Sequence, residues 1–184
     1  GLFQNSLQGD SAIASIASSF GVSSTYSDKE VRLVKVADSK AQTFIEYDFI
    51  KQPDIAQTVF AMCAALNVNG LFTGLKTLFI KETDRIKAFQ TELAKVQVYL
   101  SKVPKRFIDS EGDDFYMIEG EATYDMSPTF DTYQDHRMAM ALAPLAIQHP
   151  IFINDPAVVS KSYPEFWEHL KSLGFVIEDN DSSL

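Results

Sequence analysis

Charged residues gather in three short motifs, and each motif stands where the sequence predicts the start of a helix. The motifs are Lys81-Glu82-Thr83-Asp84-Arg85, Asp135-His136-Arg137-Met138-Ala139, and Lys161 before Ser162. The first turn of a helix leaves backbone N–H groups free and carries a partial positive charge, so it favours anions. With Lys and Arg nearby, we interpret these ends as a site for a phosphate or carboxylate ligand. The carboxylates beside the cations could move protons.

The candidate site residues are Asp54, Lys81, Glu82, Arg85, His136, Arg137 and Lys161. Each has a structural explanation when it is taken alone. Asp54 would be an ordinary helix N-cap, Glu82 would complement the dipole of a first turn, and His136 alone is more typical of a surface or packed histidine. Together they indicate a functional site, because Lys and Arg at helix starts oppose the dipole unless an anion compensates them. The residues alone therefore support an anion-binding α/β domain and leave enzyme activity open.

Composition places the chain among ordinary globular proteins. It has 184 residues, of which 46% are hydrophobic and 22% charged, enough for one sizeable core or two small ones. The net charge of −9 argues against a nucleic-acid surface, and it means that local clustering must create any anion site. The sequence shows no signal peptide and no apolar run of membrane-spanning length, so we expect a cytoplasmic protein without a membrane partner.

Cys63 is the only cysteine, so an internal disulfide is impossible and a reducing compartment fits. It lies in an apolar helical stretch, which favours a small core residue over a nucleophile. The chain begins Gly1-Leu2-Phe3-Gln4 without an initiator methionine, and we expect it to be a piece of a longer protein.

Helices and strands are predicted to position the charged motifs. Apolar spacing, caps and stops predict helices from Asp10 to Gly21, from Asp54 to Leu66, from Thr83 to Val96, from Asp135 to Pro144 and from Ser162 to Leu173. The last of these opens with the Ser-x-x-Glu spacing of a capping box. Alternation and β-branched residues predict paired strands at 30–37 and 43–49. Gly70 and Gly74 are interpreted as breaks, and shorter strands are expected at 78–80, 115–118 and 151–153.

Three predicted helix ends share one pattern, in which Gly or Gln stands between two apolar residues and leads into a strand. They are Phe20-Gly21-Val22, Val96-Gln97-Val98 and Leu173-Gly174-Phe175, and they recur 76 and 77 residues apart (20 to 96, 96 to 173). An acidic residue is also followed by a lysine at similar spacing in two places, Asp54 to Lys81 and Asp135 to Lys161. Repetition at this period predicts a supersecondary unit that is used more than once.

Three motifs resemble the C-terminal motifs of the 5-enolpyruvylshikimate-3-phosphate synthase family. They are Lys81-Glu82-Thr83-Asp84-Arg85-Ile86, Asp135-His136-Arg137-Met138-Ala139-Met140-Ala141, and Asp155-Pro156 followed by Lys161-Ser162-Tyr163-Pro164. Gln8-Gly9-Asp10 and Pro53-Asp54 are also similar to that family. The resemblance covers essentially the whole chain, with the motifs in order.

The resemblance implies an α/β (α+β) fold of repeated βαβαββ units, an inside-out α/β barrel. Enzymes of this family have two globular domains with the active site in the cleft between them, and both chain ends contribute to one domain. The resemblance therefore implies that residues 1–184 are a single C-terminal domain fragment of a two-domain enzyme, with its first unit truncated. The missing N-terminal domain of the same protein would be its partner.

By resemblance, the reaction joins phosphoenolpyruvate to the 5-hydroxyl of shikimate 3-phosphate and releases phosphate, in aromatic amino-acid biosynthesis. Asp54 would act as the base toward the hydroxyl. Glu82 would give a proton to the methylene carbon of phosphoenolpyruvate and later take one back. Lys81 would bridge the two substrates and stabilise the tetrahedral intermediate.

The resemblance also implies the residues that hold the anionic substrates. Arg85, Arg137 and Lys161 would bind the carboxylate and phosphate of phosphoenolpyruvate, with His136 nearby. Thr77 stands where the family often has an Asn that helps bind shikimate phosphate, and Thr still offers one hydrogen bond. The resemblance implies no metal and no organic cofactor.

Two other functions remain open at this point. One is the related enolpyruvyl transferase that acts on a sugar nucleotide, although the Asp-His-Arg-Met-Ala run favours the shikimate enzyme. The other is a non-catalytic anion-binding module on the same scaffold. We expect this chain alone to be inactive, because the partner domain supplies most contacts to shikimate 3-phosphate. One departure from the family is Gln97 in place of the usual Gly at a helix end, where a left-handed residue costs roughly 1 kcal/mol more without Gly.

Overall fold

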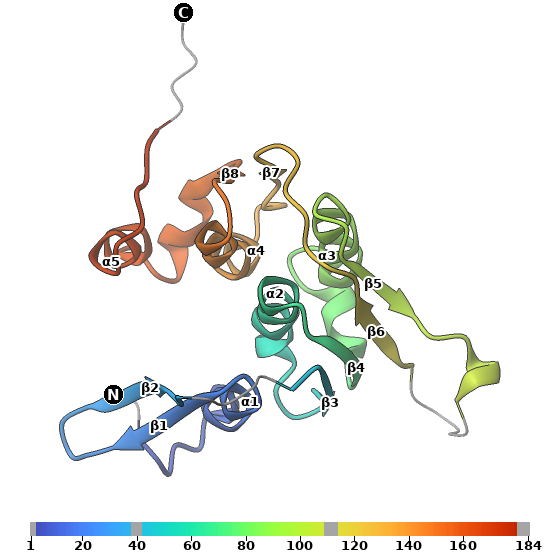
Figure 1. The fold of residues 1–184 in the computed structure, drawn as a ribbon, viewed down its shortest axis with the longest axis horizontal. Coiled ribbons are helices and arrows are strands. Elements are labelled where there is room, and N and C mark those ends of the chain that lie inside the picture. Colours follow the sequence, from blue (N-terminus) through green and yellow to red (C-terminus); the bar gives the residue numbers. More distant parts are fainter. Residues whose placement is uncertain (1–2, 38–41, 109–113, 180–184) are drawn as a thin grey trace, which may run out of the picture.

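The computed structural model describes residues 3–37, 42–108 and 114–179, and it confirms a mixed α/β fold (Figure 1). The helices and strands are α1 (Ile13–Ser19), β1 (Val22–Tyr26), β2 (Val31–Lys35), β3 (Phe44–Asp48), α2 (Ala56–Leu66), β4 (Asn69–Thr73), α3 (Arg85–Ala94), β5 (Tyr99–Lys102), β6 (Tyr116–Glu119), β7 (Thr129–Phe130), α4 (His136–Leu142), β8 (Phe152–Ile153) and α5 (Phe166–Ser172). Short 3-10 helices lie between them at Gly9–Ala12, Pro53–Ile55, Lys76–Ile80, Lys105–Phe107, Ala143–Ile147 and Pro156–Lys161. None of the helices in the described ranges combines the length and the apolar character of a membrane-crossing segment.

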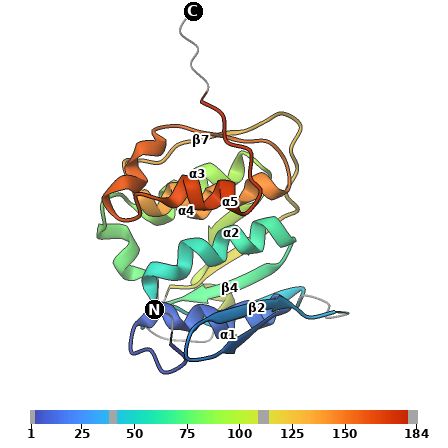
Figure 2. The ribbon, with the colours of Figure 1, turned by 90° about the vertical axis from the view of Figure 1, so that its left-hand side faces the viewer.

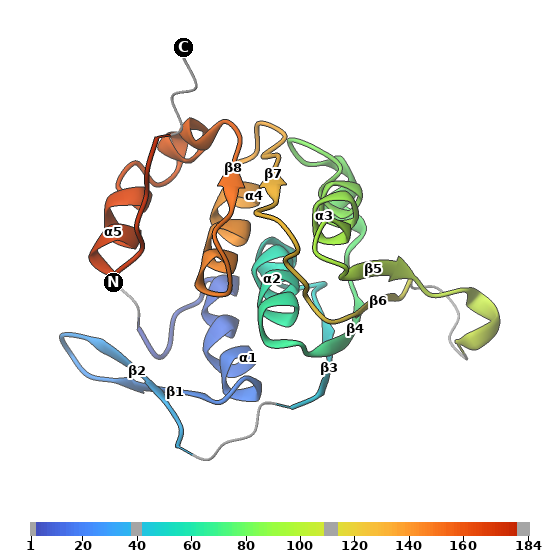
Figure 3. The same ribbon diagram turned by 45° about the horizontal axis from the view of Figure 1, so that its top comes forward.

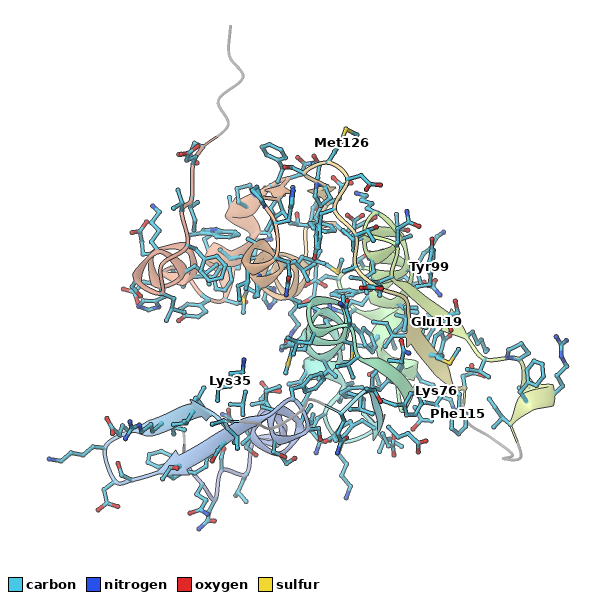
Figure 4. The ribbon with its side chains drawn as sticks, in the orientation of Figure 1. Lys35, Lys76, Tyr99, Phe115, Glu119 and Met126 are labelled. Carbon is cyan, nitrogen blue, oxygen red and sulfur yellow. The ribbon has the colours of Figure 1, made fainter. Side chains whose placement is uncertain are left out.

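A mixed four-stranded sheet, in the order β3-β4-β6-β5, forms the centre of the fold. β3 runs parallel to β4, whereas β6 is antiparallel to both of its neighbours. Tyr99 of the edge strand β5 lies opposite Glu119 of β6 (Figure 4). The parallel pair needs a crossover connection, which α2 supplies. α3 connects β4 to β5, so α2 and α3 lie side by side against this sheet (Figures 1 and 3).

β1 and β2 form a separate antiparallel hairpin beside α1, below α2 in Figure 2. The predicted pairing of 30–37 with 43–49 is therefore wrong, since β2 pairs with β1 and β3 pairs with β4. The turn explains the difference: the Ser27 hydroxyl accepts the N–H of Glu30 at 3.1 Å and closes a local hairpin. Alternating hydrophobicity identifies a strand and its buried face, but it does not identify the partner strand.

The main core lies between α2, α3 and the central sheet. Four phenylalanine rings pack there, namely Phe60 of α2, Phe72 of β4, Phe89 of α3 and Phe49, which directly follows β3. Ring centroids are 5.2 Å apart for Phe60 and Phe72 and 5.8 Å apart for Phe60 and Phe89. Cys63 is buried in the same core, as predicted, and burial raises the pKa of its thiol to about 12. This packing holds the bodies of α2 and α3 together.

α4 packs against α2 on the side away from α3, and it lies between α2 and α5 (Figure 3). Met138 and Leu142 of α4 belong to the main core, whereas Ala139 packs in a second cluster with Phe166 of α5. The helix ends at Leu142, which confirms the early stop predicted from Pro144. The starts of α2, α3 and α4 thus come close together, and these starts bear most of the candidate site residues.

The starts of α3 and α4 are capped by aspartate side chains. Asp84 accepts the N–H of Lys87 and Asp135 accepts the N–H of Arg137. The cap at Asp135 confirms the prediction, whereas α3 begins at Arg85 and so starts two residues later than predicted. Side-chain oxygens here satisfy N–H groups that have no partner within the helix.

Three other predicted helix caps are wrong. Asp10 and Asp54 lie inside 3-10 helices that precede α1 and α2, and neither helix has a side-chain cap. α5 begins at Phe166 without a side-chain cap, so Ser162 and Glu165 form no capping box. The Phe166 N–H instead donates to the Tyr163 carbonyl at 3.1 Å. In each case a preceding turn of backbone supplies acceptors, and the carboxylate of Asp54 stays available for other partners.

The strand predicted at 78–80 is wrong, because these residues belong to the 3-10 helix Lys76–Ile80. The strand is β4, which lies earlier and includes Gly70. A Cβ at Gly70 would lie 2.5 Å from the ring of Phe72. Gly70 is therefore a packing requirement inside a strand, and not the break that the sequence predicts.

Left-handed residues end three helical segments, as the shared pattern predicts. Gly21, Gln97 and Gly174 have φ values of 80°, 63° and 99°. β1 follows Gly21 directly and β5 begins two residues after Gln97, but the described residues that follow Gly174, up to 179, form no strand. The third predicted strand is therefore wrong, and most of the predicted tail at 179–184 lies outside the described residues.

Gln97→Gly is expected to have a free energy of unfolding about 1 kcal/mol higher than that of Gln97→Ala, because Gly adopts a positive φ without the steric cost of a Cβ. The Ala variant is the matched control, since both variants lose the hydrogen bond that Tyr99 donates to the Gln97 side chain at 2.8 Å and only Ala keeps the Cβ. Urea unfolding followed by circular dichroism measures both variants. A Gly variant no more stable than the Ala variant would contradict the strain assigned to residue 97.

Candidate functional site

The buried side chain of Arg85 is the centre of a cluster of carboxylates. Its Nε donates to Asp135 Oδ2 at 2.7 Å, and its Nη2 donates to Glu82 Oε2 at 2.7 Å. Its Nη1 donates to Asp54 Oδ1 at 3.1 Å. The Arg85 side chain is 2% exposed, so these bonds form away from bulk water. One guanidinium thus joins the segments before α2, α3 and α4.

Asp135 is fully buried and connects the starts of two helices. Its Oδ1 accepts the N–H of Arg137 at 2.9 Å and so caps α4, while both of its oxygens accept from Arg85 in α3. A buried carboxylate is tolerated when its oxygens are paired in this way. The sequence predicts the cap but misses the pairing with Arg85, because the two residues are 50 positions apart and no local pattern connects them.

Asp54 is shared by three cations. Lys81 Nζ lies 3.4 Å from its Oδ1, Arg137 Nη2 lies 3.4 Å from its Oδ2, and Arg85 donates to Oδ1. Arg137 also donates to the backbone carbonyl of Asp54 at 2.9 Å. Burial alone would raise the pKa of the Asp54 carboxyl, but the charges of Arg137, Lys81 and Arg85 outweigh burial and hold the pKa below its ordinary value. Asp54 is therefore ionised at neutral pH.

Solvent reaches only part of the cluster. The side chain of Glu82 is 51% exposed, and those of Asp54, Lys81 and Arg137 are 34%, 33% and 30% exposed. These four can meet a ligand directly. Arg85 is nearly enclosed, and four hydrogen bonds to carboxylates occupy its guanidinium.

The cluster balances its own charges. Three carboxylates face three cations, namely Asp54, Glu82 and Asp135 against Lys81, Arg85 and Arg137. The cations at the helix starts are thus compensated by the protein, and their position alone does not require an external anion, contrary to the sequence argument. No group of three or more His, Cys, Asp and Glu side chains within 3–37, 42–108 and 114–179 is placed to hold a metal ion.

The remaining predicted site residues lie at the margin of the cluster or outside it. His136 Nδ1 is 3.9 Å from Asp135 Oδ1, and its side chain is 19% exposed. Thr77 is exposed in the 3-10 helix Lys76–Ile80. Lys161 is exposed at the end of the 3-10 helix Pro156–Lys161, so its predicted place at a helix start is wrong: the chain turns again before α5 begins. Within the described residues, the side chains of Thr77 and Lys161 form no hydrogen bond or ion pair.

The chain is similar in sequence to enzymes of one family. The family model described as EPSP synthase (3-phosphoshikimate 1-carboxyvinyltransferase) matches residues 1–170. A 3-phosphoshikimate 1-carboxyvinyltransferase of Bacteroides fragilis is 43% identical over 180 residues, which are 97% of this chain and 42% of that protein. Proteins of the same name from Aliivibrio fischeri and Burkholderia cenocepacia are 33% and 34% identical, with 94% of this chain and 38% of each relative covered. The chain spans about two fifths of the length of these curated relatives.

Replacing Arg85 with Met is expected to lower the free energy of unfolding by about 3–5 kcal/mol, because Asp135 would stay buried without its cationic partner. Arg137→Met is the matched control: its side chain is 30% exposed, so its ion pair contributes about 1 kcal/mol or less. Urea unfolding of the two variants and the parent chain measures the difference. Equal losses in both variants would argue against the buried pairing.

The lowered pKa of Asp54 makes stability depend on pH. Such a carboxylate stabilises the folded chain above its unfolded pKa of about 3.9, and this contribution is lost as the pH falls through the folded pKa. Asp54→Asn is therefore expected to be less stable than the parent chain near neutral pH, with a difference that shrinks below about pH 4. Thermal unfolding of both chains across this range tests the prediction. A difference independent of pH would show that charge is not its cause.

Proposed function

Because the chain belongs to the EPSP synthase family, we propose that it carries part of the site where phosphoenolpyruvate gives its enolpyruvyl group to the 5-hydroxyl of shikimate 3-phosphate. Phosphate leaves in this reaction, which would serve aromatic amino-acid biosynthesis in the cytoplasm. The reaction needs a base, an acid and cations for two anionic substrates. The observation that carries the proposal is the meeting of Asp54, Lys81 and Glu82 around Arg85.

Asp54 is the proposed base toward the 5-hydroxyl. It is ionised, partly exposed and flanked by Lys81, whose mobile charge would bridge the substrates and stabilise the tetrahedral intermediate. Glu82 is the proposed proton donor to the methylene carbon. It is the most exposed carboxylate of the cluster, and it would take a proton back from the same carbon as phosphate leaves.

The anionic groups of phosphoenolpyruvate would bind to Arg85, Arg137 and Lys161, with His136 nearby. A substrate carboxylate would replace the one from Glu82 at Arg85 Nη2, where the present hydrogen bond is 2.7 Å long. Substrate binding would thereby release the Glu82 carboxyl from Arg85 and leave it free to face the methylene carbon. Arg offers a planar fork for such a carboxylate.

We also propose that residues 1–184 are a C-terminal domain fragment, because the charged motifs resemble the family's C-terminal motifs and the chain covers 42% of the Bacteroides fragilis relative. The N-terminal domain would supply most contacts to shikimate 3-phosphate, and Thr77 would add one hydrogen bond. With one side of the cluster open to solvent, the chain alone would bind its substrates too weakly for turnover.

The order of elements supports a repeated unit. β3, α2, β4, α3, β5 and β6 follow one another as βαβαββ and share one sheet. α1, β1 and β2 match the last part of such a unit, and β7, α4, β8 and α5 match the first part of another. We propose three such units, the first truncated, arranged as in an inside-out α/β barrel.

A chimera tests the proposed function. The segment of the Bacteroides fragilis relative that matches this chain is replaced by this chain, and phosphate release is measured with phosphoenolpyruvate and shikimate 3-phosphate. Release is expected only when both substrates are present. Glu82→Gln is expected to slow it by about 10²–10⁴-fold, since general acid–base catalysis contributes about this much. The 184-residue chain alone is expected to show no saturable turnover.

The control variant is Glu121→Gln, the same chemical change at an exposed carboxylate outside the cluster. It should leave phosphate release unchanged. A chimera that folds like the relative but releases phosphate only with a sugar-nucleotide acceptor would replace the proposed substrate. One that binds phosphoenolpyruvate without turnover on either acceptor would indicate a non-catalytic module.

A further inference from the structure

Glu92 is a fully buried carboxylate that has no part in the proposed reaction. It lies in α3 seven residues after Arg85 (92 − 85), so the two side chains share one face of the helix, two turns apart. Seven residues of α-helix rise about 10 Å. Glu92 is therefore too far along the helix to join the cluster around Arg85, and it has a separate set of partners.

Two partners of Glu92 belong to the segment that leads into α4. Its Oε2 accepts the N–H of Asp131 at 2.9 Å, and its Oε1 accepts the hydroxyl of Tyr133 at 2.7 Å. Lys95 Nζ completes the arrangement, donating to Glu92 Oε2 at 2.7 Å and to the Thr129 carbonyl at 2.8 Å. Both oxygens of the buried carboxylate thus bind one segment, 129–133, and this segment ends two residues before Asp135.

The hydroxyl of Tyr133 is the hydrogen-bond donor to Glu92 Oε1. Burial, together with the hydrogen bond and charge of Glu92, raises the pKa of its hydroxyl to about 12. The hydroxyl therefore keeps its proton at neutral pH and can donate to Glu92.

The segment turns in an uncommon way just before the site. Tyr133 and Gln134 both have left-handed backbones, with φ values of 54° and 58°. Two successive residues with side chains in this region are strained, and such strain persists only where the surrounding structure fixes it. Here Glu92 binds Asp131 before the turn and Tyr133 within it, and Arg85 binds Asp135 directly after it.

We propose that Glu92 is a positioning residue, which holds the strained turn so that Asp135 meets Arg85. One face of α3 would thus hold the chain at two points: Glu92 binds residues 131 and 133 before Asp135, and Arg85 binds Asp135 itself. Because Asp135 caps α4, the same contact sets the place of His136 and Arg137. The effect of Glu92 on turnover rests on the proposed function, whereas the effect of Glu92 on the bond between Arg85 and Asp135 does not.

The first test follows Arg85 in the 184-residue chain by nuclear magnetic resonance. The ¹H–¹⁵N signal of the Arg85 Nε–H group reports the bond to Asp135 and is identified with Arg85→Lys. Glu92→Gln keeps the size of the side chain but replaces one acceptor oxygen by a donor. Tyr133→Phe removes only the hydroxyl. Both variants are expected to shift or broaden the Arg85 signal, and Glu121→Gln is expected to leave it unchanged.

The second test measures the KM for each substrate in the chimera. A purely stabilising role of Glu92 would not change one KM selectively. Glu92→Gln and Tyr133→Phe are expected to raise the KM for phosphoenolpyruvate about tenfold, the effect of one misplaced hydrogen bond to a charged group. The KM for shikimate 3-phosphate is expected to stay the same, because its proposed contacts come mainly from the other domain. The control Glu121→Gln should change neither value.

An unchanged Arg85 signal in a folded Glu92→Gln or Tyr133→Phe chain would overturn the proposal. A loss of thermal stability with equal changes in both KM values, or with none, would overturn it as well. If Glu92→Gln does not fold, Tyr133→Phe decides alone. If the parent chimera releases no phosphate, the proposed function fails, and the Arg85 signal still decides whether Glu92 acts on Asp135.

Discussion

The buried ion pair between Arg85 and Asp135 is the interaction on which the rest of the site depends. Two charges withdrawn from water stabilise a protein only when their other hydrogen-bonding groups are satisfied too. Here Asp135 also caps α4, and Arg85 also binds Asp54 and Glu82. One pair therefore determines how the starts of α2, α3 and α4 face each other. The phenylalanine core holds the bodies of α2 and α3 together, and the ion pair orients their polar ends.

The charge balance of the cluster explains how so many ionised groups can lie together without a ligand. Three carboxylates and three cations neutralise one another, and the most exposed carboxylate, Glu82, is held by the most buried cation, Arg85. An anion that binds Arg85 Nη2 in place of Glu82 must displace that carboxylate. The proposed chemistry uses this exchange, since the group displaced from Arg85 is the one that must next handle a proton. The hydrogen bond between Arg85 and Glu82 thus stabilises the folded chain without a ligand, and it is also the bond that the proposed substrate would replace.

Local features of the fold could be predicted from sequence, and distant contacts could not. The buried faces of α3 and α4, the cap at Asp135 and the left-handed residue at Gln97 follow from spacing and chain stereochemistry. The partner of β2 and the role of Gly70 depend on residues that meet only in the folded chain. Motifs singled out most site residues, but the pairing of Arg85 with Asp135 and the contacts of Glu92 carry no local signal. Resemblance supplied the chemical roles, which spacing alone leaves open.

The sequence distances within the cluster also bear on how the chain folds. Arg85 and Asp135 are 50 positions apart, and Arg137 reaches the carbonyl of Asp54 across 83 positions. Closing such long loops costs entropy before the contacts return any free energy, whereas the helices and the β1–β2 hairpin form from neighbouring residues. We therefore expect the charged cluster to form late in folding. Contacts that form after the rate-limiting barrier slow unfolding more than they speed folding, so on this expectation the residues proposed for catalysis would also set how long the folded state lasts.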